Sequence, residues 1–242
     1  MLAMLPVLGA CLGVLTGLIG TALFALMISQ ELAAAVMTGA YFLMTGFIHL
    51  DGYMDCCDAI LPRHPDQERR RQILKDPHTG AFGAIGLVLM LLIFYGSMQT
   101  VALNYSMEAL ITFALITTVS RAMSSASVML AAPMKSSQYS DMSQSMSRAK
   151  AVPVIVVTVL AFAAAGGIVL AFGLKYGSSE SLIICLSPAL VTAAACLITG
   201  AADRRALGGM NGDISGHMIV TGEMFGILAQ ALIMHLDFSA FV

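Results

Sequence analysis

The sequence predicts an all-α, polytopic integral membrane protein with about seven transmembrane helices. Two features of its composition support this. Hydrophobic residues make up 58% of the 242 residues and charged residues only 11%, whereas a soluble domain is about one quarter charged. The mean hydropathy is +0.87. Apolar runs also recur along the whole chain, so residues 1–242 are predicted to form a single membrane-embedded domain.

Seven segments hold the roughly 17–25 predominantly apolar residues that a transmembrane helix needs. In chain order they are 5–28, 32–48, 84–101, 110–130, 152–174, 182–199 and 214–236. The second segment is short and ends against a group of aspartates. The seventh is interrupted by His217 and Glu223. Within the first, the glycines of "GACLGVLTGLIG" are expected to allow close packing against another helix.

The basic residues alternate between the two ends of these segments. Ten of the twelve Lys and Arg residues follow the second, fourth and sixth segments: Arg63, Arg69, Arg70, Arg71, Lys75, Lys135, Arg148, Lys150, Arg204 and Arg205. Lys175 follows the fifth segment, and Arg121 lies inside the fourth. By the positive-inside rule, the N-terminus and the loops after the second, fourth and sixth segments are expected in the cytoplasm.

Charge and cysteine content exclude some classes of function. A net charge of −2 and a pI near 6.2 give no indication of a nucleic-acid partner. The five cysteines show no C-x-x-C spacing, so they are expected to be small hydrophobic residues in a reduced setting. The N-terminus has no basic region of the kind that begins a cleavable signal.

The stretch "DGYMDCCD" is the first candidate site. If it is helical, Asp51, Asp55 and Asp58 fall at i, i+4 and i+7 and share one face. Neighbouring carboxylates repel one another unless a cation lies between them, and hard oxygen ligands select hard cations such as Mg²⁺. Gly52 is expected to leave room for a phosphate or nucleotide. The alternative is a solvated helix end with ordinary surface charges.

The next stretch, "PDQERRRQILKDPHTGAFG", predicts a short amphipathic helix that begins near Asp66 and ends before Pro77. Successive helical residues point about 100° apart. At most one or two of its three consecutive arginines therefore face a ligand, and the others are expected at anionic headgroups. Asp76, at the helix end, can reach back towards the metal or be a surface acid. His64 and His78 are expected to be loop residues.

The stretch "LGGMNGDISGHMIVTGEMFG" is the second candidate site. Asp213 precedes a helix and is a metal ligand, a general base or the helix N-cap. Glu223 lies about ten residues, some 15 Å, further into the seventh segment. An acid at that depth marks a functional candidate, or it pairs with Arg121, which is itself costly in a membrane unless it meets an acid or a phosphate.

These motifs resemble those of a known family. "FIHLDGYMDCCDAI", "RRRQILKDPHTGAFG", "TVSRA" and "RALGGMNGDISG" are similar, in order and spacing across about residues 5–230, to the motifs of the cobalamin synthases, the adenosylcobinamide-GDP ribazoletransferases. The resemblance implies a multi-pass enzyme of the prokaryotic inner membrane with its active site at the cytoplasmic face. Such an enzyme uses Mg²⁺ to join adenosylcobinamide-GDP to α-ribazole or α-ribazole 5′-phosphate, and it releases GMP.

The resemblance also implies roles for single residues. Asp51, Asp55 and Asp58 are expected to hold Mg²⁺ against the GDP pyrophosphate. Asp213 is the first candidate for the base that deprotonates the ribose hydroxyl, and Asp76 the second. Substrate binding is expected from His49, Gly52, Lys75, Arg121, Arg204, Gly209 and Asn211. The expected partners are the two substrates and the lipid bilayer, and the sequence leaves open a homo-oligomer or association with other enzymes of the pathway.

Two other classes of protein share some of these features. A CDP-alcohol phosphotransferase of phospholipid synthesis also pairs Mg²⁺ with an Asp-Gly acidic motif, but "DGYMDCCD" lacks its Ala-Arg continuation. A transporter could line an ion path with Arg121 and Glu223. In this chain, however, the acids gather near one membrane face, and no internal repeat is evident.

Overall fold

The computed structural model describes residues 2–134, 152–172 and 178–235, and their regular structure is helical throughout apart from one isolated bridge. A 3₁₀ turn, Leu2–Met4, precedes the first helix. The helices are α1 (Leu5–Ala25), α2 (Gln30–Met44), α3 (Ile48–Ile60), α4 (Gln67–Leu74), α5 (Ala81–Leu103), α6 (Met107–Leu130), α8 (Val152–Phe172), α9 (Ser178–Leu207) and α10 (Gly212–His235). The all-α membrane fold is therefore confirmed.

A helix lies on each of the seven predicted segments. Five helical stretches of the described residues are long and apolar enough to cross a membrane: Leu2–Ala25, Ala81–Leu103, Met107–Leu130, Ser181–Leu207 and Gly212–His235. The predicted fifth segment forms α8, which has 21 residues. The structure gives five candidate spans, or up to six if the bent pair of α2 and α3 is one span, so the number seven stays a prediction.

The second segment is the one that departs from its predicted form, because it does not continue as one helix. α2 and α3 meet at an angle of 89°. Gly46 and Phe47 both have left-handed backbone, with φ of 63° and 60°. The amide of Gly46 donates to the carbonyl of Leu43, and that of Phe47 to the carbonyl of Phe42. This pair of bonds is the Schellman motif that ends many helices, so the chain stops α2 and starts α3 in a new direction.

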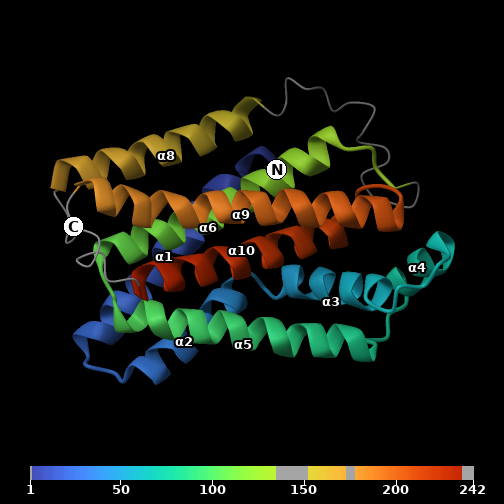
Figure 1. The fold of residues 1–242 in the computed structure, drawn as a ribbon, viewed down its shortest axis with the longest axis horizontal. Coiled ribbons are helices and arrows are strands. Elements are labelled where there is room, and N and C mark those ends of the chain that lie inside the picture. The colour runs from blue at the N-terminus through green and yellow to red at the C-terminus, as the bar shows by residue number, and fades with distance from the viewer. Residues whose placement is uncertain (1, 135–151, 173–177, 236–242) are drawn as a thin grey trace.

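The helix ends gather as the alternation of basic residues predicts. In Figure 1, α3, α5, α9 and α10 run along the long axis of the molecule, and α4 lies at one end. At that same end lie the last residues of α3, α6 and α9 and the first residues of α5 and α10. The loops that carry most of the basic residues thus start or finish at a single end of the helix bundle.

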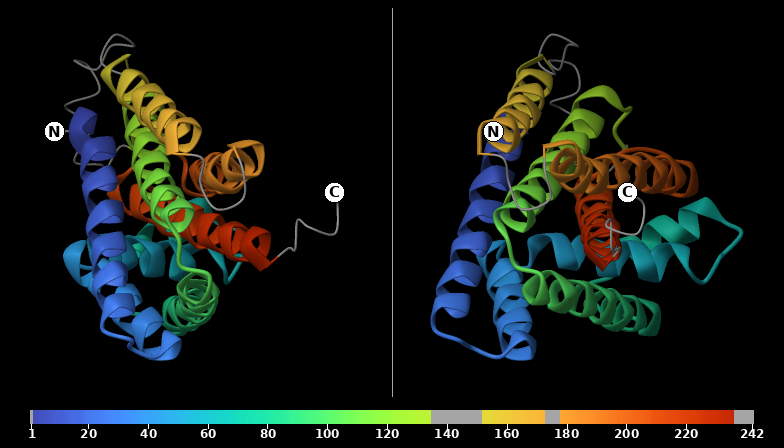
Figure 2. Two further views of the ribbon diagram at one scale, coloured as in Figure 1. Left: turned by 90° about the vertical axis from the view of Figure 1, so that its left-hand side faces the viewer. Right: turned by 60° about the vertical axis from the view of Figure 1, so that its left-hand side comes forward.

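Close helix contacts hold the bundle together. α1 and α6 lie against each other in both views of Figure 2. A Cβ added at Gly13 would lie 2.5 Å from the Cα of Ala114, which is far inside van der Waals contact. The expectation that the glycines of α1 allow close packing is therefore confirmed.

All five cysteines are free, and all but Cys11 are buried. The four buried cysteines agree with the expectation that these residues serve as small hydrophobic side chains.

Candidate active site

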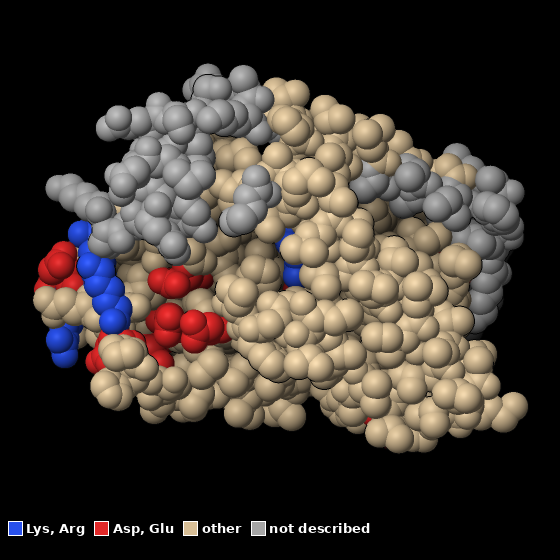
Figure 3. All heavy atoms as spheres, turned by 180° about the vertical axis from the view of Figure 1, so that it is seen from behind, with Lys and Arg blue, Asp and Glu red and all other residues tan. Residues whose placement is uncertain are grey.

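The acidic motif is helical, as predicted. Asp51, Asp55 and Asp58 lie on α3, with Asp51 exposed and the other two partly exposed. The opposite side of α3 is buried through Gly52, Tyr53, Cys56, Cys57 and Ala59. One accessible face of α3 therefore carries the carboxylates, and Figure 3 shows acidic side chains gathered at one end of the molecule beside basic ones.

Asp58 has a partner that the sequence did not reveal. Its Oδ2 accepts a hydrogen bond from the amide of Gly80 at 2.8 Å, and its Oδ1 accepts one from the amide of Gly83 at 2.8 Å. These amides belong to the N-cap and first turn of α5, whose unpaired donors favour an anion. A Cβ at either glycine would collide with the carboxylate. The glycines of "KDPHTGAFG" thus make room for Asp58.

The start of α10 provides a further acid. Asn211 accepts a hydrogen bond from the amide of Ile214 at 3.0 Å through Oδ1, and its Nδ2 donates to Oδ2 of Asp213 at 2.6 Å. The side chain that caps α10 is thus Asn211. The alternative in which Asp213 serves as the N-cap is wrong, and its partly exposed carboxylate is held in place by Asn211.

α3 and α10 cross at two glycines. A Cβ at Gly52 would lie 2.9 Å from the Cα and the carbonyl oxygen of Asp213, and one at Gly216 would lie 3.0 Å from the carbonyl oxygen of His49. The expectation that Gly52 leaves room for a phosphate is therefore wrong, because the backbone of α10 fills that space. The close crossing brings Asp213 beside the acidic helix and places the partly buried His49 against α10.

Among the described residues, the carboxylates at this crossing have no basic partner. Within the part of the chain that the structure describes, no Lys, Arg or His pairs with Asp51, Asp55 or Asp213. Like charges this close repel one another unless a cation is present. Their ligand atoms do not gather as a tight set of three, but Mg²⁺ commonly takes only one or two carboxylates together with substrate phosphates. The residues fit such an ion.

Lys75 and Asp76 lie between α4 and α5. Lys75 is the C-cap of α4 and is exposed. Oδ1 of Asp76 accepts a hydrogen bond from the amide of His78 at 3.0 Å and lies 2.7 Å from Nδ1 of that residue. These hydrogen bonds from His78 lower the pKa of the Asp76 carboxyl, which makes it a weaker base. His64 and His78 lie in loops, as predicted.

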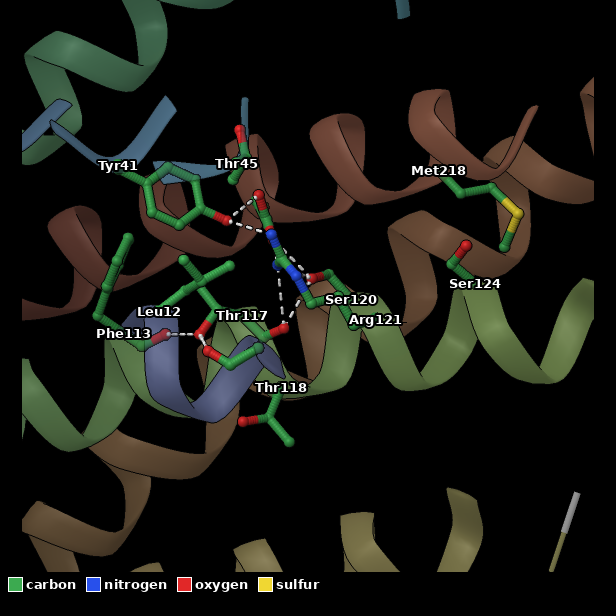
Figure 4. A network of polar contacts seen from close by, with 12 residues as sticks. Leu12, Tyr41, Thr45, Phe113, Thr117, Thr118, Ser120, Arg121, Ser124 and Met218 are labelled. Carbon is green, nitrogen blue, oxygen red and sulfur yellow. Dashed lines mark hydrogen bonds and ion pairs between the residues drawn. The ribbon is translucent and has the colours of Figure 1, made fainter. Parts of the chain in front are cut away.

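Arg121 lies deep in the bundle, away from solvent. It is fully buried and pairs with Glu223, which also accepts hydrogen bonds from Tyr41 and Ser120 at 2.6 Å each. Figure 4 shows Arg121, Tyr41 and Ser120 converging between helices. The expectation that Arg121 binds substrate is corrected, because its guanidinium is enclosed. The alternative, that Arg121 and Glu223 pair with each other, is confirmed.

Arg204 and Gly209 line a largely apolar cavity of about 530 Å³ at the end of α6. Its walls are Met123, Ala126, Ser127, Leu130, Ala131, Ala132, Arg204, Gly208 and Gly209. The segment after α6 pairs with the turn before α10, where the amide of Met134 donates to Met210 and the amide of Met210 donates to Ala132, both at 2.9 Å. The cavity therefore has one wall made by this backbone pairing.

Arg71 has a structural role next to this cavity. Its Nε donates to the carbonyl of Leu207 at 2.7 Å, and Gln67 of the same helix donates to the carbonyl of Arg205 at 3.2 Å. These bonds fasten α4 to the end of α9. The Arg71 side chain is thus hydrogen-bonded to a backbone carbonyl. This agrees with the expectation that the three arginines do not all bind a ligand.

Sequence reasoning assigned no role to a second group of side chains. Cys56, Asp203 and His217 come together from α3, α9 and α10. The sequence feature that could have pointed to this group is the position of His217, four residues after Asp213 and so on the same helical face.

Comparison with known proteins agrees with these motifs. The model of the CobS family, described as cobalamin-5-phosphate synthase, matches residues 1–231. An adenosylcobinamide-GDP ribazoletransferase of Clostridium perfringens strain 13 is 32% identical over 231 residues, covering 94% of this chain and 85% of the relative. One from Lachnoclostridium phytofermentans is 30% identical over 231 residues, covering 94% of this chain and 81% of the relative. One from Methanosarcina mazei is 40% identical over 96 residues, covering 40% of this chain and 34% of the relative. No solved structure matches.

Proposed function

The chain belongs to the cobalamin-5-phosphate synthase family and is an enzyme of late cobalamin assembly, and we propose that it joins adenosylcobinamide-GDP to α-ribazole or α-ribazole 5′-phosphate with release of GMP. The observation that carries this proposal is the crossing of α3 and α10. There Asp51, Asp55 and Asp213 lie without a basic partner in the described residues. An anionic pyrophosphate can approach such a site only together with a cation.

The cation is proposed to be Mg²⁺, held by Asp51 and Asp55 of α3. Both offer oxygen atoms on the accessible face of the helix. Both carboxylate oxygens of Asp58 already accept hydrogen bonds from backbone amides. Its main contribution is therefore to fix the start of α5 beside the acidic face. When bound, Mg²⁺ neutralises the charge that develops on the leaving GMP.

Asp213 is proposed as the general base. The side-chain Nδ2 of Asn211 donates to Oδ2 of Asp213 at 2.6 Å and thereby orients the carboxylate. Within the described residues no donor contacts its other oxygen, which can take the proton of the ribose hydroxyl as the hydroxyl oxygen attacks phosphorus. Asp76 suits this role less well, because it is exposed and already hydrogen-bonded to His78.

The cavity beside Arg204 is the proposed site for part of the substrate. It lies at the same end of the bundle as the acidic face and has largely apolar walls apart from Arg204. A guanidinium at the edge of an apolar cavity can bind a phosphate oxygen while the walls cover a bulky group. Lys75, exposed after α4, is a second candidate for phosphate contact.

The proposed location is the cytoplasmic membrane of a prokaryote, with the acidic end facing the cytoplasm. The end of the bundle at which α4 lies is the one that carries most of the Lys and Arg residues (Figure 1). The positive-inside rule assigns that end to the cytoplasm, where nucleotide substrates are made.

The test is a single-turnover assay on the full chain in detergent, with adenosylcobinamide-GDP, α-ribazole and Mg²⁺, in which GMP release is measured. Asp51→Ala and Asp55→Ala are each expected to abolish turnover. Glu31→Gln, an exposed acid in the first turn of α2, is the matched control and should keep it. Near-normal GMP release by either aspartate variant would overturn the metal assignment. Exchange with a CDP-lipid in place of GMP release would favour the phospholipid alternative.

A further inference from the structure

Three helices bring a thiol, a carboxylate and an imidazole together beneath the acidic face. The ligand atoms of Cys56 on α3, Asp203 on α9 and His217 on α10 all lie within 4.8 Å of one another. Cys56 is fully buried, Asp203 is 3% exposed, and the His217 side chain is 16% exposed. Among the described residues, no other three Cys, His, Asp or Glu side chains bring their ligand atoms this close together.

The Asp203 carboxylate is enclosed, and among the described residues its one partner of possible positive charge is the imidazole of His217. Its Oδ2 lies 2.7 Å from Nδ1 of His217, and within the described chain no Lys or Arg pairs with it. The ring of Tyr53 packs against the His217 ring edge-on, with centroids 5.1 Å apart, and so fixes the orientation of the imidazole. A buried carboxylate is expensive unless it is paired or bound to a metal.

The Cys56 thiol differs from two other buried thiols. Cys185 directs its sulfur at the carbonyl of Glu108, and Cys196 directs its sulfur at the carbonyl of Met218 at 3.2 Å. In the part of the chain that is described, Cys56 has no such backbone acceptor and lies with Asp203 and His217 instead. Its neighbour Cys57 is not part of the group.

We propose that Cys56, Asp203 and His217 bind one transition-metal ion of the Zn²⁺ class. Sulfur, nitrogen and oxygen donors from three residues are the usual set for zinc, which takes thiolate, imidazole and carboxylate ligands and keeps a fourth position for water or another group. Mg²⁺, which prefers oxygen, would take the acidic face of α3 instead. On binding, the hydrogen bond between His217 and Asp203 is exchanged for two metal–ligand bonds. Cys56 binds as the thiolate and releases its proton to solvent, whereas His217 binds as the neutral imidazole and keeps one proton on the ring nitrogen that does not contact the ion.

The ion would fasten the helices that form the active site. Cys56 directly follows Asp55 on α3, and His217 lies one turn after Asp213 on α10. A bond from each to a single ion, together with Asp203 of α9, would lock the crossing of α3 and α10. Its role is therefore positioning, and it does not depend on which phosphate ester the enzyme uses.

The metal content of the purified chain tests this site directly. The full-length protein, purified in detergent with a tag that contains no histidine, is stripped with a chelator, reloaded with Zn²⁺ and analysed by elemental mass spectrometry. One ion per chain is expected. Cys56→Ser, Asp203→Asn and His217→Gln should each weaken zinc binding at least about 100-fold, since even outer-shell changes typically cost 10–100-fold. Cys57→Ser, a neighbouring thiol outside the group, should retain it.

A second measurement uses the unaltered protein, so it does not depend on whether a variant folds. Reloading with Co²⁺ should give a thiolate-to-cobalt charge-transfer band, because Cys56 is a ligand. Asp51→Asn should keep that band while losing turnover, which separates this site from the Mg²⁺ site. Less than stoichiometric zinc after reloading, absence of the band, or equal zinc binding by Cys56→Ser and the parent would each overturn the proposal. So would equal loss of zinc in Cys57→Ser.

Discussion

The carboxylate of Asp58 accepts a hydrogen bond from Gly80, the N-cap residue of α5, which lies more than twenty residues further along the chain. The acidic motif of α3 and the glycine motif before α5 are therefore two halves of one contact. The Asp58 carboxylate accepts hydrogen bonds from the backbone amides of Gly80 and Gly83, at 2.8 Å each. The contact sets where the loop between α4 and α5 returns to the acidic face.

Replacing Asp58 by Ala should destabilise the folded protein by about 1–2 kcal/mol, because two helix-end amides lose their acceptor. Asp58→Asn keeps one acceptor oxygen and should cost less. Thermal unfolding in detergent measures the difference. If Asp58→Ala leaves the midpoint unchanged while turnover is lost, the residue acts as a metal ligand and the cap is of little importance.

Gly52→Ala should impair turnover about 100-fold, since a displacement near 1 Å at a reacting group can cost that much. The new methyl would meet the backbone of Asp213 at 2.9 Å, and backbone cannot move aside as a side chain can. Gly96→Ala on α5 is the matched control, because nothing lies within 4 Å of a Cβ there. Equal activity of the two variants would show that the crossing tolerates separation.

Asp213→Asn should lower the rate constant for turnover by about 10²–10⁴-fold, the usual contribution of a general base. Substrate binding should change little, because the amide has nearly the same shape. Asp76→Asn should have a much smaller effect, since that acid is exposed and its pKa is already lowered by His78. Rate and Michaelis constants for GMP release distinguish the two. A larger loss in Asp76→Asn would reverse the assignment of the base.

Glu223→Gln should destabilise the protein by about 3–5 kcal/mol, because it leaves the Arg121 charge buried without its partner. Replacing both residues, as in Arg121→Met with Glu223→Gln, should recover much of that loss. The four proteins of this double-mutant cycle can be compared by thermal unfolding. Additive losses would mean that the two side chains do not interact energetically, contrary to the ion pair that they form in the structure.

The sequence was sufficient to predict the helices, because a chain in a bilayer must pair its backbone groups within each segment. Apolar run length therefore located a helix on each predicted segment. The spacing of Asp51, Asp55 and Asp58 also predicted their common face, since it depends only on helical geometry. Both predictions rest on local rules.

What the sequence did not predict depends on contacts between distant segments. Gly52 was expected to face a ligand, yet it faces α10, and periodicity does not say which helix covers which face. The partners of Asp58 belong to the same class of fact. So does the pairing of Arg121 with Glu223, which the sequence offered only as one of two alternatives. The break between α2 and α3 had a local cause in Gly46, but a single glycine in an apolar run does not distinguish a helix end from a packing contact.

The Schellman turn at Gly46 and Phe47 mechanically separates α2 from the acidic helix. In a continuous helix, any tilt that matches the apolar length of α2 to the thickness of the bilayer would also rotate the carboxylates of α3. With the two axes at 89°, α2 can tilt in membranes of different thickness while α3 keeps its contact with α10. Changes in lipid composition should therefore alter how the protein sits in the bilayer without disturbing the orientation of Asp51 and Asp55.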